Sequence, residues 1–227
     1  MQVTLIEHTH LSSCATAIRE CWASHDKGGC YPTPTDDVIE ADRALIDRIA
    51  NQFRHSSTLE HIVYRFSIDG ISRACLQELA RHRIASYSVK SSRYTLKELK
   101  AEDRFTEYTD LNSQEYVNDG RARAERYLVM TSDERVNRMS ILALDNLRDL
   151  LLEGISNDIA KFALPEAYKT SLAWTINARS LQNFLQLRSS KQALWEIRNL
   201  ANAIYQALPE THKYLFTESM AANESTH

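Results

Sequence analysis

Apolar residues at helical spacing fill most of this 227-residue chain, and this periodicity restricts its fold more than any other feature. Apolar side chains three and four positions apart predict amphipathic helices. Such helices are expected at about 12–22, 36–53, 71–83, 113–130, 133–152, 180–188 and 191–208. Strands, by alternation or β-branched and aromatic content, are expected only at about 2–7, 62–70 and 172–177. The sequence therefore predicts an α+β protein dominated by helices.

The chain is long enough for one sizeable core, and it contains no internal repeat, low-complexity tract or linker. We therefore expect a single domain over residues 1–220, followed by a frayed tail at 221–227. The glycine pair and two prolines within residues 24–35 predict a loop. Thr35 precedes two acids and is expected to cap the helix that begins at residue 36.

Composition excludes several classes of protein. The net charge of −3 argues against a general nucleic-acid binder, which needs a cationic excess. No apolar run approaches the roughly 20 residues that span a membrane, and the first residues do not resemble a signal peptide, so we expect a cytoplasmic protein without a membrane partner. The four cysteines form no CxxC pair and no HExxH motif occurs, so no metal site is expected.

The segment RHRIASYSVKSSRY at 81–94 concentrates four cations, four serines and two tyrosines, without an acid or a glycine. Guanidinium groups bind phosphate through two parallel hydrogen bonds, and hydroxyls add further donors. The alternative is a solvated helix end whose cations complement the helix dipole. Serine is a mediocre helix former that prefers loops, so its accumulation here favours a phosphate monoester site.

The segment NARSLQNFLQLR at 177–188 follows a predicted strand. On a helix, Arg179, Asn183 and Leu187 lie one turn apart on one face. An arginine among leucines can simply extend its charged head to water. Two asparagines and two arginines at the end of a strand also suit a heterocycle bearing amides and phosphates, which is the sharper interpretation.

A third segment, RHSSTLEH at 54–61, contains two histidines six residues apart that do not share a helix face. Its hydroxyl residues can cap a turn without any further role.

These three segments, in this order, resemble the flavin-dependent thymidylate synthases. The family signature is RHR, seven variable residues and a serine, which is matched here by Arg81, His82, Arg83 and Ser91, followed by Arg93. NARSLQNFLQLR is a second match about 90 residues downstream. Together with HSSTLEH, the resemblance covers roughly residues 20–200.

The resemblance implies the fold of that family, with a small, mainly antiparallel sheet. It also implies an enzyme that methylates deoxyuridine monophosphate (dUMP) to thymidine monophosphate (dTMP). Methylenetetrahydrofolate would donate the carbon, and NADPH would supply reducing equivalents through bound FAD. Relatives are homotetramers with active sites between subunits, so the same assembly is implied for this chain.

Family positions transfer residue by residue. The implied FAD contacts are Ser57, Arg81, His82, Arg83, Val89, Asn177, Ala178, Arg179 and Asn183. The implied dUMP contacts are Glu78, Leu79, Ala80, Arg81, Val89, Lys90, Ser91, Ser92, Arg93, Lys161 and Arg188.

Three residues are catalytic candidates by the same resemblance. Arg188 would face the uracil and stabilise negative charge on it, as a preorganised donor does. Ser91 would bind and activate the substrate, because an unassisted serine is a weak nucleophile. His55 would position the flavin or relay a proton.

The chain departs from common family residues at three places: Glu78 stands where glutamine is frequent, Lys161 where arginine is frequent, and Ser88 and Val89 replace an asparagine and an acid. Two other functions are compatible with parts of the pattern. One is a catalytically silent nucleotide- and flavin-binding regulator, which the departures at Glu78 and Val89 suggest. The other is a helical RNA-binding module that uses the basic segment.

Overall fold

The computed structural model of the protein describes residues 1–53, 56–107 and 115–221, with the backbone alone at 53, 56 and 93–95. It divides into two compact units. Unit 1 comprises residues 1–69, 78–88 and 172–227, and unit 2 comprises residues 70–77 and 89–171. The single domain expected at 1–220 stays a prediction. The expected frayed tail, residues 221–227, lies outside the described residues except for its first residue, which ends a helix.

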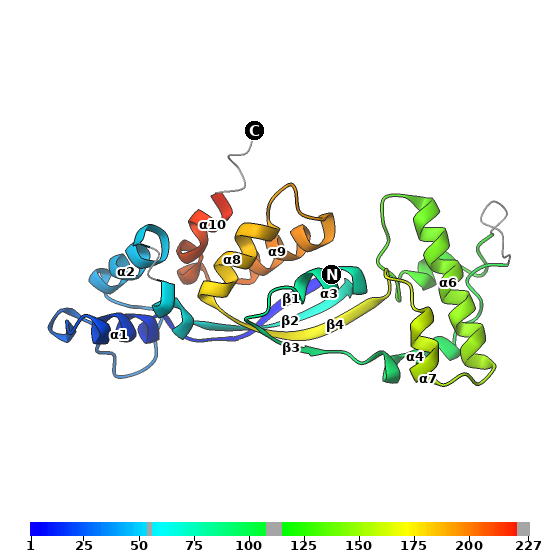
Figure 1. The fold of residues 1–227 in the computed structure, drawn as a ribbon, viewed down its shortest axis with the longest axis horizontal. Helices are drawn as coiled ribbons and strands as arrows, with labels where there is room; N and C mark the ends of the chain where they lie inside the picture. Colours follow the sequence, from blue (N-terminus) through cyan, green and yellow to red (C-terminus); the bar gives the residue numbers. More distant parts are fainter. Residues whose placement is uncertain (54–55, 108–114, 222–227) are drawn as a thin grey trace. The chain divides into compact units, whose positions relative to one another are not determined.

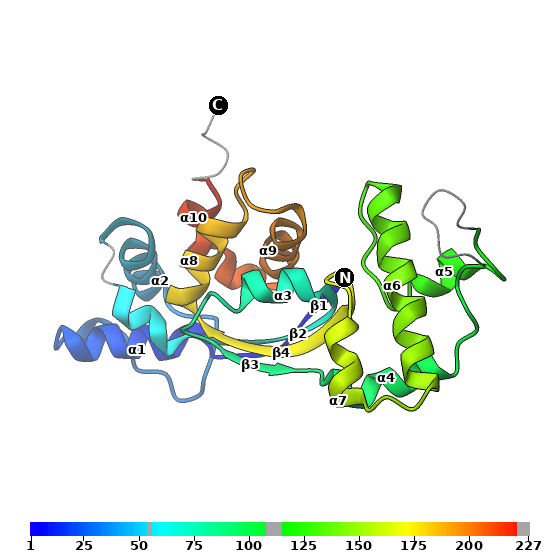
Figure 2. The same cartoon turned by 45° about the vertical axis from the view of Figure 1, so that its right-hand side comes forward.

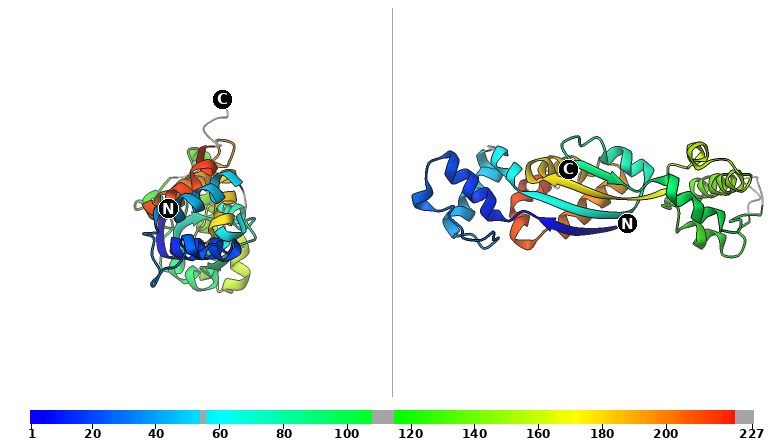
Figure 3. Two further views of the ribbon diagram at one scale, coloured as in Figure 1. Left: turned by 90° about the vertical axis from the view of Figure 1, so that its left-hand side faces the viewer. Right: turned by 90° about the horizontal axis from the view of Figure 1, so that it is seen from below.

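A small four-stranded antiparallel sheet has the strand order β1-β2-β4-β3 (Figure 3). The strands are β1 (Gln2–His8), β2 (Val63–Ser72), β3 (Ser86–Val89) and β4 (Lys169–Asn177). In the β1–β2 pair Gln2 lies opposite Asp69, and the register shifts between Leu5 and Glu7. The three predicted strands and the α+β class are confirmed, whereas β3 was not predicted.

The core of unit 1 forms where alternate residues of the central strands meet two helices. Tyr64, Phe66 and Trp174 are fully buried, as the period of two along a strand requires. Helices α8 (Ala178–Arg188) and α9 (Trp195–Ala207) cover this face of the sheet (Figure 1). The ring centroid of Trp174 lies 5.1 Å from that of Phe184 on α8, in an edge-to-face arrangement.

The remaining helices assigned to unit 1 have at most 11 residues, which is the length of α8. They are α1 (Leu11–Cys21), α2 (Glu40–Asp47) with a π-helical extension at Arg48–Phe53, α10 (Thr217–Ala221) and 3₁₀ turns at His25–Lys27, Ser56–His61 and Glu210–Phe216. Helix α3 (Arg73–Leu79) begins in unit 2 and ends in unit 1. None of the helices in the described ranges is both long enough and apolar enough to cross a membrane.

The predicted start of α2 at residue 36 is wrong. The helix begins at Glu40, because Asp36 has other partners: its carboxylate accepts hydrogen bonds from the backbone N–H of Leu11 at 3.0 Å and from His8 and His212 at 2.8 and 2.9 Å. Thr35 Oγ1 accepts from the N–H of Asp37, which closes a local turn rather than a helix cap. Long-range polar contacts therefore override the local capping signal.

Unit 2 packs shorter helices against one long helix, α6 (Glu134–Leu152), as Figures 1 and 2 show. The others are α4 (Ser92–Lys100), α5 (Gly120–Ala124), α7 (Asn157–Ala160) and a 3₁₀ turn at Lys161–Ala163. Asp133 caps α6 by accepting from the N–H of Arg135. The buried face of α6 contributes Ile141, Leu144, Leu147 and Leu151 to the core of the unit.

The helix expected at 113–130 is wrong over most of its length. Residues 113–114 lie outside the described residues, and only α5 at Gly120–Ala124 is helical in the rest. Asn118 and Asp119 have positive φ angles of 46° and 57°, which interrupt a helix. At Gly120, a Cβ atom would lie 1.9 Å from the carbonyl oxygen of Phe105, so the close approach of the two backbones requires glycine.

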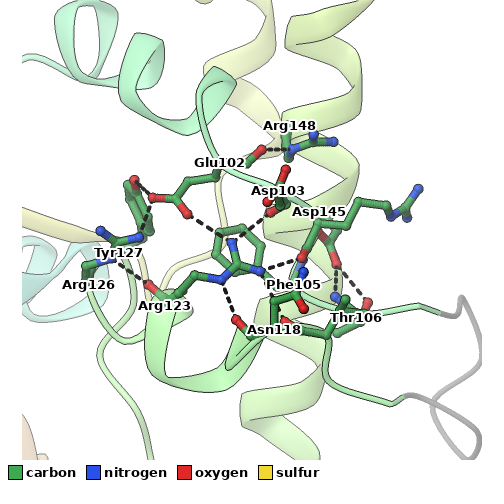
Figure 4. Close-up of polar contacts among 12 residues, drawn as sticks. Glu102, Asp103, Phe105, Thr106, Asn118, Arg123, Arg126, Tyr127, Asp145 and Arg148 are labelled. Carbon is green, nitrogen blue, oxygen red and sulfur yellow. Dashed lines mark hydrogen bonds and ion pairs between the residues drawn. The ribbon is translucent and has the colours of Figure 1, made fainter.

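Hydrogen bonds from charged side chains stabilise this part of unit 2, where helical structure is interrupted (Figure 4). The carboxylate of Asp145, fully buried on α6, accepts hydrogen bonds from the N–H groups of Phe105 and Thr106 at 2.9 and 3.0 Å and from the Thr106 hydroxyl at 2.7 Å. Arg123 reaches the Glu102 carboxylate at 3.0 Å. These charges satisfy backbone donors and acceptors that no helix or sheet supplies.

Candidate active site

A cavity of about 690 Å³ in unit 1 brings together residues from all three motif segments, with Glu60 as the contribution of segment 54–61. Its lining combines the turn after α3 with one face of α8. The lining residues are Glu60, Arg81, His82, Arg83, Ile84, Arg179, Ser180, Asn183, Leu187 and Arg188. Residues about 100 positions apart in sequence thus share one polar, cationic cavity.

Tyr87 fixes the turn that carries the RHR residues. Helix α3 ends at Leu79, and the chain then turns so that the N–H of His82 donates to the carbonyl of Leu79 at 3.1 Å. The Tyr87 hydroxyl lies 2.9 Å from that carbonyl and 2.6 Å from the carbonyl of His82. These bonds hold the Arg81 and Arg83 side chains on the exposed side and His82 inside.

The N-terminus of α8 is fixed by Asn177, whose side chain accepts a hydrogen bond from the N–H of Ser180 at 2.8 Å. This cap uses the amide oxygen of a predicted FAD-contacting residue. From there, Arg179 and Asn183 project into the cavity one turn apart, as the helical spacing predicted.

Arg188, at the end of α8, makes the central polar contacts of this cavity. Its Nη1 donates to the Glu78 carboxylate at 2.9 Å, and its Nε donates to His82 Nε2 at 3.0 Å. The Arg188 side chain is 16% exposed. This largely buried guanidinium group is therefore preoriented by an acid and an imidazole that both come from the α3–RHR segment.

His82 is held neutral by its surroundings. Burial lowers the pKa of His82 to about 4, and the cations of Arg188 and Arg81 act in the same direction. Because Nε2 accepts from Arg188, the neutral ring carries its proton on Nδ1. The imidazole ring also packs edge-to-face on Phe184 with a centroid distance of 5.0 Å. His82 therefore acts here as a hydrogen-bond acceptor that orients Arg188.

The other cations of the cavity are more exposed. Arg81 is 71% exposed and lies 3.5 Å from the Glu78 carboxylate. Arg179 pairs with Glu60 at 2.6 Å, with both side chains about half exposed. Such exposed pairs contribute little to stability, so these guanidinium groups can exchange an acidic partner for an anionic ligand at low cost.

Besides the buried His82, two predicted contact residues have fully buried side chains. Leu79 and Ala178 are both fully buried, so any ligand contact must come through their backbones. The N–H of Ala178 already donates to the carbonyl of Ile62 at 2.8 Å, and the carbonyl of Leu79 accepts from Tyr87. Ala80, in contrast, is exposed at the start of the turn.

A second cavity, of about 240 Å³, lies in unit 2. It is lined by three predicted residues of the basic segment: Val89, Lys90 and Ser92. Sequence reasoning missed the residues that line it with them, among which the cations are Arg73, Arg126 and Lys169. In the sequence these cations are marked only by their position near an end of a predicted helix or strand. Basic residues are too common at such positions to identify a binding site.

Among the remaining predicted residues, those with described side chains line neither cavity. Ser57 is exposed in a 3₁₀ turn, and Ser91 is the exposed residue that precedes α4, without a side-chain capping bond. Lys161 lies 3.9 Å from Asp158 in unit 2. His55 lies outside the described residues, as does the side chain of Arg93. The roles assigned to these residues therefore stay predictions.

Comparisons with known proteins point to one family. Residues 4–212 match the family described as thymidylate synthase complementing protein. The flavin-dependent thymidylate synthase of Wolinella succinogenes is 61% identical over 216 residues, which are 95% of this chain and 97% of that protein. The enzyme of the same name from Helicobacter pylori (strain J99) is 52% identical over 224 residues, 97% of this chain and 99% of that one.

A solved structure extends the agreement to the fold. The crystal structure of thymidylate synthase X (ThyX) from Helicobacter pylori with FAD and dUMP has a TM-score of 0.85 and 51% sequence identity, and the match covers 97% of this chain and 99% of that chain. This chain belongs to the flavin-dependent thymidylate synthases. Family membership confirms the resemblance seen in the motifs, including the fold expected from it.

Within the flavin-dependent thymidylate synthases, the departure at Glu78 acquires a structural meaning. A glutamine at this position cannot neutralise the guanidinium of Arg188, whereas the carboxylate forms a charge-assisted hydrogen bond with it. The acid thus compensates a largely buried positive charge at the base of the cavity. Val89 is 41% exposed and offers no polar side chain, so its contribution to any ligand is through its backbone or apolar surface.

Proposed function

We propose that the protein converts dUMP to dTMP by reductive methylation, with bound FAD, methylenetetrahydrofolate as carbon donor and NADPH as reductant. The observation that carries this proposal is the cavity shared by the RHR turn and α8, in a chain 51% identical to a ThyX crystallised with FAD and dUMP. The Glu78–Arg188–His82 contacts within that cavity support a catalytic site rather than a silent one.

The chain's own residues fit a flavin dinucleotide. Arg81, Arg83 and Arg179 offer guanidinium groups on one cavity, which suits the two phosphates of FAD. Asn183 adds an amide on the same wall. Ser57, Val89 and the backbone around Ala178 would complete the site. When bound, the flavin supplies hydride transfer, while these residues bind and orient it.

Substrate binding divides between phosphate and base. Lys90, Ser91, Ser92, Arg93 and Lys161 would hold the dUMP phosphate through hydroxyls and cations. Lysine at position 161 would act as a point charge, without the two parallel bonds of arginine.

Arg188 would face the uracil and stabilise negative charge as the ring is activated. Its orientation by Glu78 and His82 exists before substrate binds, which is the preorganisation that such stabilisation requires. Ser91 would position the nucleotide rather than attack it, because no described histidine or acid activates its hydroxyl. His55 would orient the flavin or relay a proton.

Electron balance gives the folate product. The methylene carbon loses its two C–N bonds to the folate and gains one C–C bond to C5 of the uracil and one hydride. Meanwhile C5 releases its hydrogen as a proton, and the two folate nitrogens end up bearing N–H hydrogens. If the hydride originates from NADPH, the folate leaves without being oxidised, as tetrahydrofolate. A cytoplasmic location suits these soluble co-substrates.

A homotetramer with sites between subunits is part of the proposal. The cavity of unit 1 has apolar residues among its lining, with Ile84 73% and Leu187 56% exposed. Side chains of this size are more often covered by a ligand or another subunit. The predicted dUMP residues are also divided between the two units, so an active site need not be completed by one chain.

An activity assay tests the proposed function. Purified protein should be yellow, release tritium from C5-labelled dUMP only with NADPH and methylenetetrahydrofolate, and form dTMP and tetrahydrofolate. Omission of NADPH is the matched control. Bound flavin without tritium release would favour the silent regulator. A colourless protein with salt-sensitive RNA binding would favour the RNA-binding module.

A further inference from the structure

Three side chains with metal-binding donor atoms converge near the junction of β1 and α1. His8 Nε2 lies 2.8 Å from Asp36 Oδ2, and His10 Nδ1 lies 3.2 Å from Asp36 Oδ1. One donor atom from each residue lies within 4.8 Å of the other two. All three belong to unit 1 and are part of neither cavity described above.

The two separations from Asp36 are close to those between ligands in the coordination sphere of a small transition metal. Bonds of about 2.0–2.2 Å from zinc to imidazole nitrogen and carboxylate oxygen place neighbouring ligands of a tetrahedron about 3.3 Å apart. The observed contacts of 2.8 and 3.2 Å with Asp36 need to open by a few tenths of an ångström, and the donor atoms of His8 and His10, which lie within 4.8 Å of each other, need to approach. Two imidazoles and a carboxylate, with no sulfur, are a donor set that suits zinc and other divalent first-row metals.

His10 supplies an independent indication. Its Nδ1 atom is buried and has no hydrogen-bond partner. The atom lies 3.2 Å from Asp36 Oδ1, but the angles between the two groups do not allow a hydrogen bond. Buried polar atoms are normally paired, and an unpaired one calls for an explanation such as an ion. The atom is directed at the same carboxylate that His8 contacts, so a shared cation would satisfy it.

The Asp36 carboxylate is oriented by hydrogen bonds from residues outside the proposed ligand set, as metal-binding carboxylates usually are. Its Oδ1 accepts from the N–H of Leu11 at 3.0 Å and from Nε2 of the fully buried His212 at 2.9 Å. His212 Nδ1 in turn lies 2.8 Å from the Tyr64 hydroxyl. Burial would raise the pKa of Asp36, but the hydrogen bonds from His8 and His212 outweigh it and keep that pKa well below its usual range. Such outer partners orient ligands and tune affinity.

We propose that His8 Nε2, His10 Nδ1 and the Asp36 carboxylate form a binding site for a divalent first-row transition metal, with zinc as the best fit. Three protein ligands leave the fourth tetrahedral position to water. His212 and Tyr64 orient the carboxylate without binding the ion. When the ion binds, the proton on His8 Nε2 moves to Nδ1 or to solvent, so no redox step is involved. The site is independent of the proposed synthase activity.

Zinc titration of the full-length chain, stripped of metal with a chelator, tests the proposal. The wild-type protein should bind one equivalent of Zn²⁺ and show a higher melting temperature with it. His10→Ala should weaken binding by roughly 100-fold or more, beyond what loss of an outer partner alone costs. His8→Ala should do the same. His25→Ala is the matched control, because His25 is an exposed histidine paired with Glu20 on the surface, and it should bind like wild type.

Cobalt substitution identifies the ligands even if a variant unfolds. Co²⁺ in the wild-type protein should give the visible bands of a nitrogen- and oxygen-bound tetrahedral ion. A thiolate charge-transfer band would place the ion on the exposed Cys21 or Cys30 and overturn the proposal. Absence of zinc binding in the wild type, or unchanged affinity in folded His10→Ala, would overturn it as well.

Discussion

Replacing Arg188 by alanine should abolish turnover while flavin binding persists. Among the cations of the unit 1 cavity whose contacts are described above, the Arg188 guanidinium group is the least exposed. Its partners Glu78 and His82 hold it in one orientation. Removing a preorganised donor that faces developing charge costs roughly 10² to 10³ in kcat, or about 3–4 kcal/mol of transition-state stabilisation. Loss of the two short contacts costs the fold about 1–3 kcal/mol.

The two effects are separable by experiment. Flavin content comes from the visible spectrum, stability from thermal unfolding, and kcat from tritium release at saturating dUMP. Arg188→Lys keeps a charge but loses the planar fork, so it should recover only part of the rate. Arg179→Ala is the matched control. Its exposed pair with Glu60 contributes little to stability, and its loss should lower FAD retention, with activity restored by added FAD.

Two results would refute this reasoning. Wild-type kcat in Arg188→Ala would remove the residue from catalysis. A colourless Arg188→Ala protein, beside a yellow Arg179→Ala protein, would exchange the roles that we assign to the two arginines.

Three further outcomes follow from the structure. The pKa of folded His82 lies near 4 and that of the unfolded residue near 6.5, so the unfolded state binds more protons between these two pH values. The contribution of His82 to the free energy of unfolding should therefore decrease as the pH is lowered from about 6.5 to 4 and stay constant above pH 6.5. Titration of the His82 ring near pH 6.5 by NMR would contradict this. Asp145→Asn should destabilise unit 2 by about 3 kcal/mol in urea unfolding, whereas Glu153→Gln at the exposed end of the same helix should change little. Gly120→Ala should also lower the midpoint, since its Cβ would meet the Phe105 carbonyl, and unchanged stability would show that the backbone relaxes.

Local signals predicted most of the fold. The apolar spacing at 133–152 predicted α6, and the strand expected at 172–177 corresponds to β4. The failures occur where distant residues decide the outcome. Asp36 looked like part of a helix start, but histidines and a backbone N–H far away in sequence use its carboxylate instead. At 113–130 the Asn118–Asp119–Gly120 turn signal was present and was outweighed by the apolar spacing around it.

The site was predictable to the extent that its motifs are contiguous. Spacing placed Arg179 and Asn183 on one helix face, and both line the cavity. The pairing of Arg188 with Glu78 joins segments 110 residues apart, and no periodicity within either segment indicates it. The cations of the second cavity were missed for the same reason, because Arg73 and Lys169 become neighbours only through the fold.

The structure of the purified assembly with FAD and dUMP tests the central claim most directly. The account predicts the flavin against the RHR turn and α8, with the uracil beside it and the Arg188 guanidinium within hydrogen-bonding distance of the base. Both compounds bound elsewhere, with Arg188 still paired only to Glu78 and His82, would contradict it.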